Sequence, residues 1–190
     1  CRGCGERISI KYSLIEMLNS LLYVLIYCNY GNSIDSLKGF LLSSLLIVIA
    51  GIDLKTHYIY KSTTIFGIGA FIFIEIIDLL ISWQIPWENL LAGALGVIVI
   101  GAIVFFTGGM GEGDIEIALI IGLFLGIKGL MLALFIAFIL GGIIASIFLI
   151  LKFKERKAEI AFGPYLAMGA IISLLYSTEI INWYISLMKI

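Results

Sequence analysis

Residues 108–122 read GGMGEGDIEIALIIG, and this segment sets four glycines and one aspartate, Asp114, directly before an apolar run. Glycine has no Cβ, so its backbone turns sharply and lets other groups approach closely. One interpretation is a tight turn between two helices, with Asp114 as the N-cap of the second helix. The other is a functional site, because a carboxylate at the mouth of a hydrophobic segment is costly and usually functional.

The composition excludes an ordinary soluble domain. The chain has 190 residues, of which 62% are hydrophobic and 13% charged, and its mean hydropathy is +1.15. Soluble domains are about 45–50% apolar and about 25% charged. We therefore predict an all-α, polytopic membrane helix bundle embedded in a lipid bilayer. The net charge of −1 gives no indication of nucleic-acid binding, and three cysteines exclude a dense disulfide framework.

Hydrophobic segments separated by short polar loops predict about seven transmembrane helices, since each span needs about 20 mostly apolar residues. The predicted spans are residues 13–30, 37–52, 64–83, 90–107, 115–127, 129–151 and 160–176. The fifth is short for a span, and Lys128 marks its far end. Residues 180–190 either continue the last helix or form a short span of their own. Together, residues 13–190 are predicted to form one membrane-embedded domain.

Residues 1–12 are predicted to be a cytoplasmic loop, because they include Arg2, Arg7 and Lys11. Cys1 and Cys4 form a C-x-x-C pair that can supply half of a tetrahedral zinc site, since a complete site needs two more ligands. A pair of free thiols is the alternative. The chain begins with cysteine rather than methionine, and we expect it to be a fragment of a longer protein.

The distribution of basic residues predicts the orientation of the helices. If residues 1–12 are cytoplasmic, alternation places nine of the twelve Lys and Arg residues on the cytoplasmic side, in agreement with the positive-inside rule. Asp53 then ends one span on that side, and Asp114 begins another. Both carboxylates are therefore expected at one membrane depth, on separate helices that can be neighbours.

Two aspartates brought close together can perform acid–base catalysis. One keeps a proton while the other is ionised, so the pair titrates as a unit. The ionised member can take a proton from water, and the protonated member can donate one to a peptide carbonyl, as in aspartic proteases. We predict that Asp53 and Asp114 are catalytic and that Gly111 and Gly113 belong to the active-site loop. This proteolytic chemistry needs no cofactor.

Four segments, in this order along the chain, resemble the type IV prepilin peptidases, the polytopic aspartic leader peptidases of bacteria. They are CRGCGERISIKYSLIEMLNSLLY at residues 1–23, GIDLKTHYI at 51–59, GMGEGDIEIALIIGLFLG at 109–126 and FGPYLAMGAI at 162–171. The resemblance covers nearly the whole chain. It places the first catalytic aspartate of the family at Asp53 and the second at Asp114.

The resemblance implies a multi-pass enzyme of the bacterial cytoplasmic membrane. It would cleave prepilin or pseudopilin precursors at the cytoplasmic face, just after a glycine and before the hydrophobic helix. Full-length relatives often also methylate the new N-terminus with S-adenosylmethionine. They carry an earlier C-x-x-C, which completes a zinc site with the pair equivalent to Cys1 and Cys4. That earlier pair and a first span are expected upstream of Cys1.

Two positions depart from the family pattern. Relatives usually have Ile-Pro where this chain has Ile59 and Tyr60, and they usually have Lys where it has Glu116. The second change reverses a charge near Asp114. A residue two positions along a helix should, however, point away from that aspartate.

Three alternative functions fit parts of the sequence. Residues 111–114 also resemble the G-x-G-D intramembrane proteases of the presenilin and signal-peptide-peptidase kind, but those carry a Pro-Ala-Leu motif where this chain has Gly-Pro-Tyr at 163–165. Intramembrane acids such as Glu75, Asp78 and Asp114 suit a small proton or cation transporter. We interpret Glu75 and Asp78, which share a helix face, mainly as structural polar contacts. An assembly subunit without chemistry is the third alternative.

Overall fold

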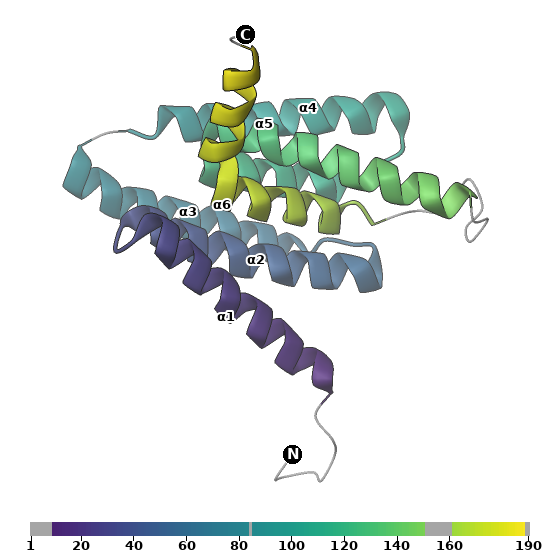
Figure 1. The fold of residues 1–190 in the computed structure, drawn as a ribbon, viewed down its shortest axis with the longest axis horizontal. Coiled ribbons are helices and arrows are strands. Elements are labelled where there is room, and N and C mark those ends of the chain that lie inside the picture. The colour runs from purple at the N-terminus through teal and green to yellow at the C-terminus, as the bar shows by residue number, and fades with distance from the viewer. Residues whose placement is uncertain (1–8, 84, 151–160, 189–190) are drawn as a thin grey trace.

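The computed structural model describes residues 9–83, 85–150 and 161–188, and these residues form helices and no strand (Figure 1). Six helices are long and apolar enough to cross a membrane, so the prediction of an all-α polytopic bundle is confirmed. The helices are α1 (Ile10–Tyr30), α2 (Ile34–Thr56), α3 (Lys61–Ser82), α4 (Trp87–Thr107), α5 (Glu112–Ile150) and α6 (Gly163–Met188).

Helix α5 consists of two helical segments joined at Gly126, whose φ of 68° and ψ of −176° are not helical. The two segments run in opposite directions. Near the start of α5, Ile117 contacts Gly163, while Gly141 packs against Phe162, the residue just before Gly163. A straight helix would separate Ile117 from Gly141 by about 36 Å, so only a reversal brings both to the same end of the bundle.

This reversal accounts for the seventh span of the prediction. The two segments of α5 correspond to the predicted spans 115–127 and 129–151, although the break lies at Gly126 rather than at Lys128. Backbone groups freed by a broken helix in a membrane must find partners inside the protein. Asn89 Nδ2 donates to the carbonyl of Leu123 at 2.7 Å, on the N-terminal side of the break.

Helices α4, α5 and α6 pack closely because glycines bring their backbones together. A Cβ at Gly96 would lie 2.6 Å from the carbonyl oxygen of Ala118 in α5. Gly122 likewise lies against the backbone of Ala92 in α4, and Gly169 of α6 against the backbone of Ala133 in α5. These contacts fix the two segments of α5 between its neighbours.

Helix α6 is a single helix of 26 residues, so residues 180–190 continue it as far as Met188 instead of forming a separate span. Figure 1 shows its last turns, in yellow, leaning away from the direction of its first turns. Asn29 and Tyr30 at the end of α1 donate hydrogen bonds to the carbonyls of Leu175 and Leu174 in α6. Helix α1 crosses the outside of the bundle and packs mainly on α2 (Figure 1).

The acidic pair on α3 has the structural role that we predicted. Lys38 of α2 lies 2.6 Å from Oε1 of Glu75 and 3.5 Å from Oδ2 of Asp78. The side chains of Lys38 and Glu75 are only 13% and 10% exposed. Removing either one would leave the other charge buried without a partner, which is strongly destabilising. This ion pair connects α2 to α3.

Candidate active site

Asp53 lies in the last turn of α2 and is buried, with 5% of its surface exposed. The predicted span ended at residue 52, but α2 continues to Thr56, and its C-cap residue is His57, whose φ of 50° is left-handed. The Oδ2 atom of Asp53 accepts a hydrogen bond from the backbone N–H of Gly163, at 3.0 Å. The carboxylate therefore faces the first turn of α6.

Asp114 lies in the first turn of α5 and is also 5% exposed. Because α5 begins at Glu112, Asp114 is not the N-cap residue of that helix. Its Oδ2 atom accepts the backbone N–H of Gly111 at 3.1 Å, so the side chain reaches back to the glycine loop. This bond satisfies one of the N–H groups that have no partner inside the helix.

Gly111 and Gly113 have different structural roles in the loop. A Cβ at Gly113 would lie 2.8 Å from Cδ1 of Ile59, so only glycine fits between α5 and the α2–α3 connection. At Gly111 the nearest atom to a Cβ would be Oδ2 of Asp114, at 3.9 Å, which is ordinary contact. Gly111 contributes its N–H group, and any residue except proline can supply that.

Asp53 and Asp114 line one pocket of about 390 Å³ at the same end of the bundle. The pocket is a large enough cleft to take a short stretch of peptide together with a water molecule. It is lined by Asp53, His57, Tyr58, Ile59, Lys61, residues 108–114, Glu116, Ala161 and Phe162.

Glu116 also lines this pocket, although its spacing from Asp114 predicted that it would point elsewhere. Its carboxylate accepts a hydrogen bond from the hydroxyl of Thr64 at the start of α3. Glu116 therefore lines the pocket next to α3, and Asp114 lines it next to the glycine loop.

Sequence reasoning did not single out Gly163, Ile59 or Thr64 as site residues. Gly163 belongs to the FGPY segment that supports the family resemblance. The sequence therefore marks this residue, but it does not indicate that its N–H group donates to Asp53. No pattern in the sequence indicates that Ile59 fills the space beside Gly113 or that Thr64 donates to Glu116, because both contacts depend on how the helices pack.

The proposed half zinc site lies outside the described residues, because Cys1 and Cys4 precede Ser9. Within the part of the chain that the structure describes, no group of three or more His, Cys, Asp or Glu side chains is arranged to hold a metal ion.

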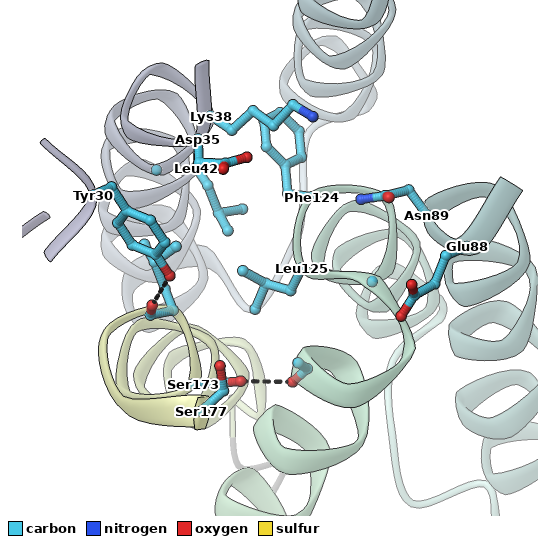
Figure 2. A pocket seen from close by; sticks show the side chains of 14 residues that line it. Tyr30, Asp35, Lys38, Leu42, Glu88, Asn89, Phe124, Leu125, Ser173 and Ser177 are labelled. Atoms are coloured by element: carbon cyan, nitrogen blue, oxygen red, sulfur yellow. Dashed lines mark hydrogen bonds between the residues drawn. The ribbon is translucent and has the colours of Figure 1, made fainter. Parts of the chain in front are cut away.

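A second pocket, of about 250 Å³, lies next to the break in α5 and shares no residue with the aspartate pocket. Figure 2 shows Tyr30, Asp35 and Lys38 on one side of it, and Glu88 and Asn89 on the other. Its polar groups mostly serve the fold, because Lys38 is paired with Glu75 and Asn89 donates to a backbone carbonyl. Neither aspartate of the predicted pair lies there, so the first pocket is the candidate active site.

Comparison with known proteins gives a consistent set of matches. The sequence model described as "Type IV leader peptidase family" matches residues 40–146, a range that includes both pocket aspartates. A protein of Bacillus subtilis (strain 168) is 30% identical over 188 residues, which cover 98% of this chain and 75% of the relative. Like the two relatives below, it is named prepilin leader peptidase/N-methyltransferase.

A relative in Xanthomonas campestris pv. campestris is 27% identical over 97% of this chain, and one in Aeromonas salmonicida is 29% identical over 98%. The chain spans only 65% of the length of each of these two relatives. No solved structure matches the chain significantly.

Proposed function

Because this chain belongs to the type IV leader peptidase family, we propose that it is a membrane aspartic endopeptidase that removes the leader of prepilin-like precursors, with Asp53 and Asp114 as the catalytic pair. The single observation that carries the proposal is that two buried carboxylates from different helices line one pocket. The family match favours a leader peptidase over a transporter or a presenilin-like protease, which were the alternatives.

The chemistry follows from one ionised and one protonated carboxyl group on either side of a water molecule. The ionised carboxylate takes a proton from the water, whose oxygen attacks the carbonyl carbon of the scissile peptide bond. The protonated carboxyl gives its proton to the carbonyl oxygen. When the C–N bond breaks, the carboxyl that took the first proton gives it to the leaving nitrogen. The other carboxylate takes back a proton from a hydroxyl of the tetrahedral intermediate as the C=O bond of the new carboxyl group forms. The pair thus returns to its starting state, and proteolysis consumes only water.

The position of the pocket suits a cut at the membrane surface. Asp53 lies in the last turn of α2 and Asp114 in the first turn of α5, so both lie where helices meet the polar loops rather than in the middle of the bundle. We propose that this end faces the cytoplasm of a bacterial cell and that the enzyme lies in the cytoplasmic membrane. The precursor would present the glycine before its hydrophobic helix at the pocket.

The relatives are named N-methyltransferases as well as leader peptidases. We propose methylation of the new N-terminus with S-adenosylmethionine only for a full-length form of this protein. The same holds for a zinc site built from Cys1, Cys4 and a second pair of cysteines. Neither is needed for the proteolytic step above.

The test is cleavage of a co-expressed precursor that carries a short basic leader, a glycine and a hydrophobic helix, in a bacterial host without its own prepilin peptidase. We expect the wild-type chain to remove the leader, as seen by mass spectrometry of the new N-terminus. Asp53→Asn and Asp114→Asn should each slow cleavage by at least about 100-fold, because each removes a proton-transferring group. Asp35→Asn, an acid of the other pocket, should leave the rate unchanged.

Two results would overturn the proposal. One is normal processing by either of the Asp53 and Asp114 variants when both accumulate in the membrane at wild-type level. The other is loss of processing in the Asp35 variant to the same extent as in the pair, which would indicate damage to the fold rather than to catalysis.

A further inference from the structure

The carboxylate of Asp53 depends on a donor from a distant part of the chain. Its Oδ2 atom accepts the backbone N–H of Gly163, at 3.0 Å, in a buried contact that joins α2 to α6. The carbonyl end of α2 carries partial negative charge and disfavours an anion there, whereas the N-terminus of α6 favours one. The first turn of α6 therefore offsets the effect of the helix that carries Asp53.

Among the first residues of α6, Gly163 has the N–H group that is free to donate a hydrogen bond to Asp53. Pro164 has no N–H group, and the N–H of Tyr165 is already bonded to the carbonyl of Phe162. The N–H of Gly163 points instead at Asp53. One amide of this turn thus supplies the hydrogen bond to the carboxylate.

Glycine is required at position 163 for space. A Cβ built there would lie 2.6 Å from Oδ2 of Asp53 and 3.1 Å from Cδ1 of Ile117. Any side chain would therefore push the carboxylate off the amide or move α6 away from α2. Both effects lengthen the hydrogen bond to Asp53.

The rest of α6 holds this amide in place. Ser173 donates to the carbonyl of Gly129 at 2.8 Å, and Gly169 sits against the backbone of Ala133, so α6 cannot slide along α5. The ring of Phe162, directly before Gly163, packs on the ring of Phe138 with centroids 5.5 Å apart. The position of the donor is thus set by the packing of two helices.

We propose that Gly163 is a positioning residue, whose backbone N–H fixes the Asp53 carboxylate in the pocket and favours its ionised form. By contrast, the donor to Asp114 is Gly111 of its own neighbouring loop. The catalytic consequence rests on the proposed function, but the effect on ionisation does not. The other ionisable groups that line the same pocket are His57, Tyr58, Lys61, Glu112, Asp114 and Glu116.

The test follows the protonation of Asp53 without requiring catalysis. The full chain in detergent micelles is treated with dicyclohexylcarbodiimide, which modifies protonated carboxyl groups, and labelling at Asp53 is measured by mass spectrometry across a pH series. Gly163→Ala is compared with wild type and with Gly142→Ala, whose added Cβ would meet nothing within 4 Å. We expect the midpoint of Asp53 labelling to move to higher pH by about one unit in Gly163→Ala only, because the ionised form loses its donor.

A measurement on the wild-type chain covers the case in which Gly163→Ala does not fold. In protein labelled with ¹⁵N-glycine, the amide proton of Gly163 should shift with the same midpoint as Asp53 labelling, and this shift should vanish in Asp53→Asn. An unchanged labelling midpoint in a folded Gly163→Ala protein, or an amide proton of Gly163 that does not respond to pH, would overturn the proposal.

Activity then separates the two proposals. If wild type cleaves the precursor, Gly163→Ala should lower kcat about 10-fold or more with little change in KM, and should move the acid limb of the pH–rate profile upward. If wild type cleaves no precursor while the labelling midpoint still shifts, the proposed function fails and the positioning role of Gly163 stands.

Discussion

The hydroxyl of Thr64 donates a hydrogen bond to Oε2 of Glu116, and this contact joins the start of α3 to α5 beside the aspartate pocket. Thr64 is buried, with 6% of its surface exposed, whereas Glu116 is only half-buried at the edge of the pocket. The carboxylate of Glu116 needs a hydrogen-bond donor at this half-buried position. Thr64 supplies that donor.

Replacing this donor should destabilise the protein. Thr64→Val keeps the shape of the side chain but removes the hydroxyl, which leaves the Glu116 carboxylate without the donor that it has now. Since a hydrogen bond to a charged group contributes about 1.5–3 kcal/mol, we expect the free energy of unfolding to fall by about that amount. Denaturant titration in detergent micelles measures it.

Thr63→Val is the matched control, because Thr63 lies on the same turn and its side chain makes no hydrogen bond among the described residues. It should change stability by less than about 0.5 kcal/mol. In the double variant Thr64→Val/Glu116→Gln the losses should not add, since both changes remove the same contact. Full additivity would show that the contact contributes nothing.

The ion pair between Lys38 and Glu75 predicts a larger effect. Lys38→Met leaves the Glu75 carboxylate buried without its partner, and breaking a buried pair in this way costs about 3–5 kcal/mol. Asp78, whose side chain is 29% exposed, can turn to solvent more easily. Unfolding in mixed micelles should therefore begin at a much lower denaturant concentration than in wild type.

Removing both charges tests this explanation. Lys38→Met/Glu75→Leu should recover most of the lost stability, because apolar side chains of similar volume replace a buried pair at little cost. Lys55→Met, on the same helix but exposed and without an ion pair among the described residues, should have little effect. If the double variant is no more stable than Lys38→Met, the loss comes from packing rather than from charge.

Most of the fold was predictable because hydropathy dominates a membrane chain. The sequence could not settle the helix ends where polar residues interrupt an apolar run. Residues 177–179 (Ser-Thr-Glu) left open whether the last helix continues, and α6 runs through them, because three polar residues do not disrupt the hydrogen bonds of a helix. Lys128 suggested the end of a span, but the reversal needs a backbone conformation that glycine adopts readily, and Gly126 supplies it.

The pairing of Asp53 and Asp114 at one end of the bundle was predictable from the alternation of spans. Their surroundings were not. The donor to Asp53 comes from Gly163, 110 residues away, and it depends on how α6 packs on α5. Glu116 was expected to point away from Asp114, but the pocket extends to Lys61 at the start of α3 and so includes both acids.

The pH dependence of leader cleavage tests the acid–base pair. In the proposed mechanism, one carboxyl group is ionised and the other is protonated, so the rate should fall toward low pH, where both are protonated, and toward high pH, where both are ionised. We expect a bell-shaped profile of kcat in proteoliposomes. Glu116→Gln should retain both limbs of the profile. The Glu116 carboxylate accepts a hydrogen bond from Thr64 and has no proton-transfer role in the proposed mechanism. A profile with one limb would contradict the shared roles.

The contact between Gly122 and Ala92 predicts how sensitive the helix packing is to one added methyl group. A Cβ at Gly122 would collide with the backbone of Ala92 and would lie 2.7 Å from the amide nitrogen of Gly93, and these atoms cannot rotate away as a side chain can. Gly122→Ala should therefore separate α4 from α5 and destabilise the protein by about 1–3 kcal/mol, the usual cost of overpacking.

Gly69→Ala is the control, since a Cβ on that residue of α3 would meet nothing within 4 Å. Alanine is the better helix former by about 1 kcal/mol, so this variant should be as stable as wild type or slightly more stable. Because Gly122 lies on the segment of α5 that begins at the aspartate pocket, Gly122→Ala should also slow leader cleavage, whereas Gly69→Ala should not. Equal stability of the two variants in the same micelles would mean that α4 and α5 do not approach as closely as described.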